Sequence, residues 1–188
     1  MIIIVEGLDR CGKDTQIRNI KQYLLEQNEN KSVHELHYSS IPVKDNVQER
    51  SLVLYFDMFR IIDAIRESND IHLILNRSHI GEAVYAPLYR EYSGDYIFEV
   101  ERHFKEALKE IKLITLIDSS FKCLDRDDGL SLSNKSLEKV NDELNYFIEA
   151  TNKSHIKNKI IIDINGLSID DVKNKIIDFV SKWSRIIH

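Results

Sequence analysis

The sequence predicts an α/β fold, a five-stranded parallel sheet with helices on both faces, from two features. Short runs rich in Ile, Leu and Val alternate with long amphipathic stretches along the 188 residues, and no repeat, low-complexity run or linker interrupts them. Strands and helices that alternate in this way form a parallel sheet covered on both sides. Hydrophobic residues make up 43% of the chain and charged residues 30%, as in a soluble globular protein, so we expect one domain spanning 1–188.

The five expected strands are short and apolar, as strands buried on both faces should be. They are residues 1–6, 33–38, 71–75, 111–117 and 158–163. The longer stretches between them predict six helices, and the chain has only two prolines to interrupt them. These are residues 13–26, 48–68, 79–90, 95–110, 136–152 and 168–186. The last has the clearest start, because Ser168 precedes Asp170 and Asp171 in its first turn.

Charge and cysteine content exclude several classes of protein. The formal net charge of −5 gives the chain no overall footprint for a nucleic acid polymer or an anionic membrane. Its apolar start MIIIV is too short for a secretory signal, and no stretch approaches the roughly 18 apolar residues of a membrane span. Cys11 and Cys123 show no disulfide or metal-ligand spacing, and a redox switch is not expected. We therefore expect a cytoplasmic protein without nucleic acid or membrane partners.

The segment GLDRCGKDT, residues 7–15, nearly matches the phosphate-binding pattern G-x-x-x-x-G-K-[ST]. It follows an expected strand and opens an expected helix, which is the context in which the pattern forms a phosphate loop. Gly7 and Gly12 let the backbone curl so that N–H groups point at a phosphate, and the helix start adds its positive dipole end. Lys13 would reach the β- and γ-phosphates of ATP. A glycine turn with an exposed lysine is the alternative interpretation.

Asp14 departs from the pattern, which has a serine or threonine there as a magnesium ligand. Three interpretations remain open. Asp14 binds Mg²⁺ directly or through water, since a carboxylate is a stronger and charged ligand; it favours the helix N-terminus; or the site is inactive. The first is preferred, because the rest of the loop is intact and Thr15 still supplies a hydroxyl.

Glu6 before the glycine and Asp9 inside the loop are not required by a generic phosphate loop. With them, the stretch VEGLDRCGKDTQ resembles the P-loop of thymidylate kinases, EG-x-D-x-x-GK-[ST]-T. Four further segments resemble that family in the same order, so that the resemblance covers nearly the whole chain. They are LYFDMFR at 54–60, LNRSHIGEAVY ending at Tyr85, IDSSFKCLDR at 117–126 and IIIDINGLSIDDV at 160–172.

This resemblance implies a P-loop kinase fold with a short lid at about residues 119–136. It also implies Mg²⁺ as cofactor, ATP as phosphoryl donor and a deoxynucleoside monophosphate as substrate. The family is commonly dimeric, so a homodimer is implied as well. Variants around NRSHIGEAVY and the short lid indicate a viral or phage-type branch, whose members would act in the host cytoplasm.

The resemblance implies phosphate contacts for four cations, which are Arg10, Lys13, Arg77 and Arg126. Arg77 would hold the acceptor phosphate and Arg126 would lie near ATP, while Asp9 would accept a hydrogen bond from the deoxyribose 3′-hydroxyl. The chemistry agrees, because phosphoryl transfer depends on positioning and positive charge. Two phosphate-bearing substrates bring about six negative charges, of which magnesium offsets two. For Arg77 alone, a surface arginine after a strand is the alternative.

The base and sugar contacts implied by the resemblance come from two helices. Phe56 would stack on the acceptor base, and Arg60, four residues later on the same helix face, would hydrogen-bond its edge; from periodicity alone Phe56 is a core residue. Tyr85 would crowd a ribose 2′-hydroxyl. Glu82 only accepts hydrogen bonds, which suits guanine or cytosine better than thymine. A solvent-exposed helical glutamate is the alternative.

Asn76 stands where the family has an aspartate, so a charge is lost there while Asp14 adds one. A charge swap between these positions is a hypothesis. The expected function is ATP-dependent phosphorylation of a deoxynucleoside 5′-monophosphate, dTMP or a related nucleotide, to the diphosphate. The alternatives are a deoxynucleoside kinase acting on the 5′-hydroxyl and a nucleotide-binding regulator without turnover. The first alternative lacks the carboxylate that would follow the second strand as general base, where the sequence reads HELHYSSIP.

Overall fold

The computed structural model describes residues 1–27, 30–39, 46–68, 70–125 and 136–182. Its sheet is parallel throughout, with five strands in the order β2-β3-β1-β4-β5. The strands are β1 (Ile2–Gly7), β2 (Ser32–His37), β3 (Ile71–Asn76), β4 (Ile111–Ile117) and β5 (Asn158–Asp163). Each lies within one residue of its expected bounds, so the five-stranded parallel sheet predicted from the sequence is confirmed.

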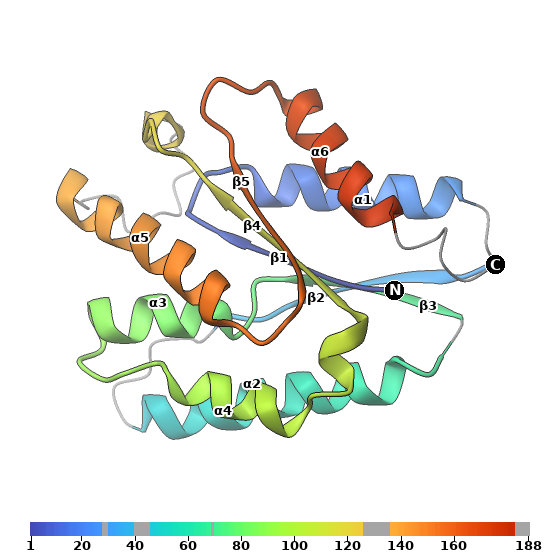
Figure 1. Ribbon diagram of the computed structural model, residues 1–188, viewed down its shortest axis with the longest axis horizontal. Helices are drawn as coiled ribbons and strands as arrows, with labels where there is room; N and C mark the ends of the chain where they lie inside the picture. Colours follow the sequence, from blue (N-terminus) through green and yellow to red (C-terminus); the bar gives the residue numbers. More distant parts are fainter. Residues whose placement is uncertain (28–29, 40–45, 69, 126–135, 183–188) are drawn as a thin grey trace.

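Helices cover both faces of this sheet, as expected. Within the described residues the helical elements are α1 (Lys13–Glu26), α2 (Val47–Ile65), α3 (Ile80–Tyr89), α4 (Tyr96–His103), η1 (Ala107–Glu110), η2 (Lys122–Asp125), α5 (Leu137–Lys153) and α6 (Ile169–Ser181). Figure 1 shows α1 and α6 over one face of the sheet and α2, α3, α4 and α5 over the other. The two central strands, β1 and β4, are completely buried between these layers.

The expected helix 95–110 is shorter in the structure. Helix α4 ends at His103, and a separate 3-10 turn follows at Ala107–Glu110. Phe104 leaves the helical conformation, with φ −107° and ψ 34°. Its ring stacks on Phe59 with centroids 5.6 Å apart and meets the edge of Phe56 at 5.0 Å. Packing against α2 therefore ends a helix that local propensity would have continued.

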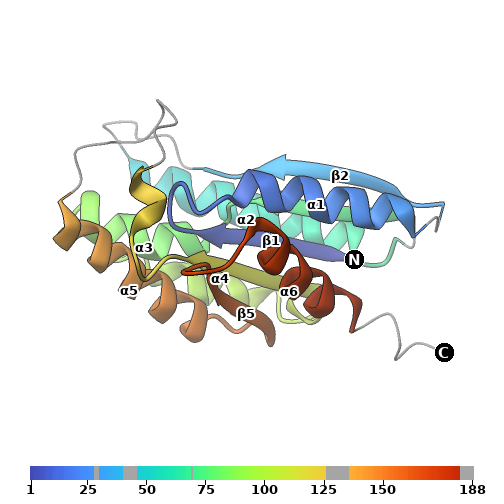
Figure 2. The ribbon, with the colours of Figure 1, turned by 90° about the horizontal axis from the view of Figure 1, so that it is seen from above.

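The second strand is also less buried than the sequence predicts. In β2 only Val33 and Leu36 are half-buried, and the other four side chains are exposed. Its one strand neighbour is β3, which makes it an edge of the sheet, and Figure 2 shows it there beside α1. Charged and polar side chains on such an edge discourage pairing with another chain, which explains its composition.

The ends of the helices show how local chemistry sets their bounds. At the start of α6, Ser168 and Asp171 form a capping box, in which each side chain accepts a hydrogen bond from the other's backbone N–H. This confirms the helix start predicted from the sequence. The helix ends at Ser181, and residues 183–186 of the expected helix lie outside the described residues. Among the described residues, no helix is long and apolar enough to cross a membrane.

The sheet brings two loops together. In the parallel ladder Val5 of β1 lies opposite Asn76 of β3, so the carboxyl ends of these two strands lie side by side at one end of the sheet. In folds of this kind ligands bind at the carboxyl ends of the strands. The glycine motif follows β1, and Arg77 follows Asn76, the last residue of β3, so the residues expected to bind a ligand lie at this end of the sheet.

Candidate functional site

The loop between β1 and α1 has the backbone of a phosphate loop. Gly7 has φ 132°, and a Cβ there would lie 1.9 Å from the carbonyl oxygen of Leu116, so the loop can press against β4 only through glycine. The next residue, Leu8, donates its N–H to that same carbonyl at 3.0 Å. Gly12 has φ 81° and is the residue from which α1 begins. Both glycines thus occupy conformations that other residues rarely adopt.

Lys13 lies folded back over this loop. Its side chain is buried, and Nζ donates to the carbonyl oxygens of Gly7 at 2.9 Å and Leu8 at 2.7 Å. Burial lowers the pKa of Lys13, and so does the nearby charge of Arg77. The exposed alternative for this lysine is therefore wrong. The loop carries a cation held by backbone carbonyls, next to a second cation from the following strand.

Asp14 and Asn76, which lie 62 positions apart in the sequence, meet in the structure. Asn76 donates from Nδ2 to Oδ1 of Asp14 at 2.9 Å. Asp14 is exposed, whereas Asn76 is buried at the end of β3. The two positions between which the sequence predicted a charge swap are thus direct neighbours.

One oxygen donor at this point suits Mg²⁺. The carboxylate of Asp14 is a hard oxygen ligand of the kind magnesium prefers, whereas Asn76 turns its amide nitrogen toward it and the hydroxyl of Thr15 accepts from Arg18 at 3.4 Å. Over the residues that the structure describes, no three His, Cys, Asp or Glu side chains gather into a metal-binding group. A magnesium ion here would take its remaining ligands from phosphates and water, as is usual for this metal.

Arg77 forms an ion pair with Asp9 across the two loops. Its Nη2 lies 2.9 Å from Oδ1 of Asp9, and both side chains are about one-third exposed. Burial opposes the charge of Arg77, but Asp9 raises its pKa above the usual range. Asp9 is therefore engaged by Arg77 in this structure. Its predicted contact with a sugar hydroxyl stays a prediction.

Glu6 is buried beneath this pair. Its Oε1 accepts hydrogen bonds from the N–H of Ser78 at 2.5 Å, from the Ser78 hydroxyl at 2.9 Å and from the N–H of Gly81 at 3.2 Å. All three donors belong to the segment that leads from β3 into α3. In the sequence Glu6 was only part of a motif, and nothing there indicated its partners.

Arg10 and Cys11 fasten the loop to the segment after β4. Arg10, with φ 64°, donates from Nη1 to the carbonyl oxygen of Leu124 at 2.6 Å. A thiol–thiol hydrogen bond with Cys123, together with burial, raises the pKa of Cys11, so Cys11 is not a ready thiolate. The spacing of the two cysteines did not indicate that they meet. Arg126 and residues 126–135 of the expected lid lie outside the described residues.

Phe56 and Arg60 make different kinds of contact. The Phe56 ring packs on α4, with centroids 5.4 Å from His103 and 5.0 Å from Phe104. The Arg60 side chain is 68% exposed and pairs with Asp57 at 3.4 Å. The core interpretation of Phe56 describes its packing here, and the base contacts of both residues stay predictions.

Tyr85 lies close to the Asp9–Arg77 pair. Its ring meets Phe147 of α5 edge-on, with centroids 5.8 Å apart. Burial and the charge of Asp9 raise the pKa of Tyr85. One turn later on α3, Tyr89 donates its hydroxyl to Glu143, a buried carboxylate on α5. Helix α5 thus closes this side of the site, which a sequence pattern centred on the loops could not show.

Glu82 is buried rather than exposed, which corrects the alternative interpretation of this residue. Its Oε1 accepts from the hydroxyls of Tyr92 at 2.5 Å and Tyr96 at 2.9 Å, and its Oε2 from Arg90 at 2.5 Å. A buried carboxylate needs such donors to offset the loss of water. A contact between Glu82 and a base stays a prediction, and it would have to share oxygens that already have three partners.

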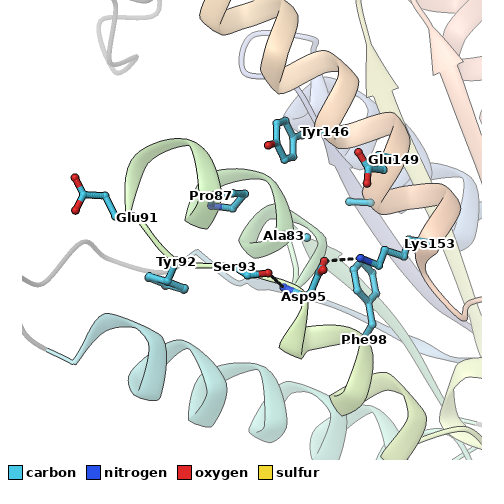
Figure 3. Close-up of a pocket in the computed structure, with 12 residues that line it drawn as sticks. Ala83, Pro87, Glu91, Tyr92, Ser93, Asp95, Phe98, Tyr146, Glu149 and Lys153 are labelled. Carbon is cyan, nitrogen blue, oxygen red and sulfur yellow. Dashed lines mark hydrogen bonds and ion pairs between the residues drawn. The ribbon is translucent and has the colours of Figure 1, made fainter.

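A cavity of about 430 Å³ lies behind this site, between α3, α4 and α5 (Figure 3). Pro87 and Tyr146 face it from opposite sides, and the ion pair between Asp95 and Lys153, at 2.7 Å, crosses its lower end. Of the predicted site residues that the structure describes, none lines it. The candidate site is therefore at the carboxyl ends of β1 and β3, where Lys13 and Arg77 lie, and not in this cavity.

Comparison with known proteins supports the fold. No protein-family model matches the sequence, and no curated protein matches it. Among solved structures, the YorR protein of Bacillus subtilis in complex with phosphorylated GDP is similar with a TM-score of 0.69 and 17% identity, over 100% of both chains. A thymidylate kinase from Candida albicans is similar with a TM-score of 0.61 and 17% identity, over 97% of this chain and 92% of that one. The chain has the P-loop kinase fold that the sequence predicts.

Proposed function

We propose that the protein is an ATP-dependent kinase that phosphorylates a deoxynucleoside 5′-monophosphate to the diphosphate. The observation that supports this is the meeting of two cations from different loops. Lys13 follows β1 and Arg77 follows β3, and the register that pairs Val5 with Asn76 brings both to the carboxyl end of the sheet, where burial and then the charge of Arg77 lower the pKa of Lys13. Two adjacent phosphate sites are what transfer between two nucleotides requires.

In this proposal the chain positions phosphates and offsets their charge. The backbone of residues 7–15 and Lys13 hold the β- and γ-phosphates of ATP, with Arg10 and Arg126 adding charge. Arg77 holds the acceptor phosphate, and Asp9 the 3′-hydroxyl of its sugar. An oxygen of the acceptor phosphate attacks the γ-phosphorus as its bond to ADP breaks. The acceptor is already ionised, so no general base is needed.

Mg²⁺, when bound, neutralises charge on the transferring phosphate. We propose Asp14 as its protein ligand, with Thr15 alongside. The contact between Asp14 and Asn76 supports this, because the carboxylate at position 14 reaches the place that an aspartate at 76 would occupy. The charge needed by the metal is kept although the residue that carries it has changed.

The identity of the base belongs to the same proposal. Phe56, Arg60, Glu82 and Tyr85 are the proposed contacts of the acceptor nucleoside, with dTMP or a related nucleotide as substrate. Glu82 favours a base that offers N–H donors, such as guanine or cytosine. The YorR structure holds phosphorylated GDP, which is a reason to test dGMP beside dTMP. We also propose that residues 1–188 form one such domain with its lid at about 119–136, and that it dimerises.

A coupled assay of ADP release tests the function. Each of the four deoxynucleoside monophosphates is compared with its free nucleoside, with ATP and Mg²⁺ present. At least one monophosphate should accelerate ADP release, and the diphosphate should appear in the products by ion-exchange chromatography. Acceleration by nucleosides alone would indicate a deoxynucleoside kinase. ATP binding without acceleration by any acceptor would indicate a regulator. Light scattering on the same sample tests the homodimer.

A further inference from the structure

The carboxylate of Glu6 connects the two halves of the candidate site. It is the residue of β1 directly before Gly7, where the phosphate loop begins, and its side chain is 1% exposed. Its Oε1 accepts from both the N–H and the hydroxyl of Ser78 and from the N–H of Gly81. Hydrogen bonds to a carboxylate are stronger than neutral ones, so this oxygen holds the β3–α3 loop firmly.

The residue held in place by this loop is Arg77. Its φ is 69°, in the left-handed region that is unfavourable for a non-glycine residue. Such a conformation persists only where the neighbouring structure fixes it. Two consecutive residues of β1 do this: Val5 accepts the N–H of Arg77 at 3.0 Å, and Glu6 accepts the N–H of Ser78. From this backbone the guanidinium of Arg77 reaches Asp9.

The charge of Glu6 also acts on both cations of the site. It favours the charged forms of Lys13 and of Arg77 and so opposes the cost of their burial. Glu6 thus has two separable effects. Its negative charge acts on both sides of the site, whereas its hydrogen bonds act on the acceptor side alone.

We propose that Glu6 is a positioning residue for the acceptor: its hydrogen bonds to Ser78 and Gly81 hold Arg77 in the conformation that binds the acceptor phosphate. This rests on the proposed function, and it extends that function to a residue that touches neither substrate. It also gives a physical reason for a carboxylate directly before the phosphate loop. A generic phosphate loop does not need one.

Two variants separate the charge of Glu6 from its hydrogen bonds. Glu6→Gln removes the charge but keeps an oxygen that accepts from Ser78, whereas Glu6→Ala removes both. With a monophosphate that wild type uses, Glu6→Ala should lower kcat/KM by about 10- to 100-fold, mainly by raising the KM of the acceptor. Glu6→Gln should stay within about threefold of wild type in that KM. The KM of ATP should change little in either variant. Both variants remove the negative charge of Glu6, so any change that this loss causes at Lys13 should be the same in the two.

Thr115→Val is the matched control for lost stability. Thr115 lies opposite Glu6 in the β1–β4 ladder, is fully buried and hydrogen-bonds Thr151 at 2.8 Å. Its variant should unfold at lower temperature without a change in the acceptor KM. If Glu6→Ala does not fold, Ser78→Ala removes one of the three donors and should raise the acceptor KM by about threefold.

Three results would overturn the inference. The first is an unchanged acceptor KM in Glu6→Ala. The second is a Glu6→Gln variant as impaired as Glu6→Ala. The third is a rise in the KM of ATP in Glu6→Ala that is as large as the rise in its acceptor KM. These comparisons require that wild type transfers phosphate to a monophosphate. A wild-type protein without that activity would refute the proposed function, whereas an active wild type with any of these results would refute only the role of Glu6.

Discussion

The two sides of the candidate site are built in different ways. The proposed donor side is one continuous loop, in which Gly7 and Gly12 shape the backbone and Lys13 hydrogen-bonds the carbonyls of its own loop. On the acceptor side Arg77 depends on the first strand, since Val5 accepts its N–H and Asp9 pairs with its guanidinium. A local site is lost through a change within the loop, whereas an assembled site can be lost through a change in any of its supports.

Lys13→Ala should have the largest effect and should remove the donor side. We expect kcat with every acceptor to fall by about 10²- to 10³-fold, because a preorganised charge on the transferring phosphate is lost. The unfolding temperature should change by no more than about 4 °C, since Nζ bonds only loop carbonyls. ADP release and thermal unfolding measure the two. Unchanged turnover would contradict the kinase proposal.

Arg77→Ala should remove the acceptor side alone. The rate with a monophosphate should fall at least about tenfold, the value of one charge-assisted hydrogen bond, while slow ATP hydrolysis without acceptor persists. Arg102→Ala is the matched control, because this exposed arginine pairs with Glu99 on α4 and has no part in the candidate site. The variant should leave both rates unchanged. Equal loss of the two activities in Arg77→Ala would place Arg77 on ATP instead and would erase the distinction between the sides.

Asp14 lies at the boundary between the sides, and magnesium titration tests its role. In wild type ATP binding should depend steeply on Mg²⁺, because the carboxylate repels the triphosphate when no metal is present. Asp14→Ser should lessen this dependence and retain activity. Asp14→Ala should need about tenfold more Mg²⁺ for turnover, since alanine offers the metal no ligand.

Binding of a fluorescent ATP analogue with and without Mg²⁺ gives a second measurement that does not depend on turnover. The double variant Asp14→Ser with Asn76→Asp moves the charge back across the contact and should recover the magnesium dependence that Asp14→Ser alone loses. If wild type and the single variants share one magnesium curve, Asp14 does not act on the metal. It is then better explained as a favourable residue at the start of a helix.

The smallest effect on activity should come from Lys112, which lies outside both sides of the candidate site and acts on stability. Lys112 at the start of β4 is buried, donates to the carbonyl oxygens of Phe179 and Val180, and has its pKa lowered by burial to about 8. In the unfolded chain it stays protonated up to about pH 10.5, so stability should rise between pH 8 and 10.5. The rise should be about 2 kcal/mol and absent in Lys112→Met. Denaturant unfolding of both proteins measures it, and parallel pH profiles would contradict it.

The difference between the two sides also explains what could be predicted from the sequence. The strands and the donor loop were predicted closely, because apolar runs and a contiguous glycine pattern carry their own structural information. Arg77 was predicted as a candidate from the resemblance of LNRSHIGEAVY to a segment of thymidylate kinases. Its support by Glu6 was not, because the two residues are 71 positions apart and only the sheet brings them together.

Side-chain surroundings were the least predictable part. Glu82 looked like an exposed helical carboxylate or a base contact, yet it is buried by Tyr92, Tyr96 and Arg90. The cluster of these donors shortly after Glu82 was a signal that could have indicated this. Phe56 could not be assigned from periodicity, because a ring that packs on α4 and a ring that stacks on a base occupy the same kind of position on a helix.

The position of Lys13 has a consequence for how ATP affinity should be understood. Its ammonium has two acceptors within the chain, the carbonyls of Gly7 and Leu8. Phosphate binding at Lys13 is therefore an exchange of partners rather than a simple gain, and the measured affinity reports the difference between the old bonds and the new. An anion too short to satisfy the ammonium, or too weakly charged to compete with carbonyls, gains little there. Under the proposed function, the two carbonyls that hold Lys13 would therefore favour a triphosphate over smaller or more weakly charged anions.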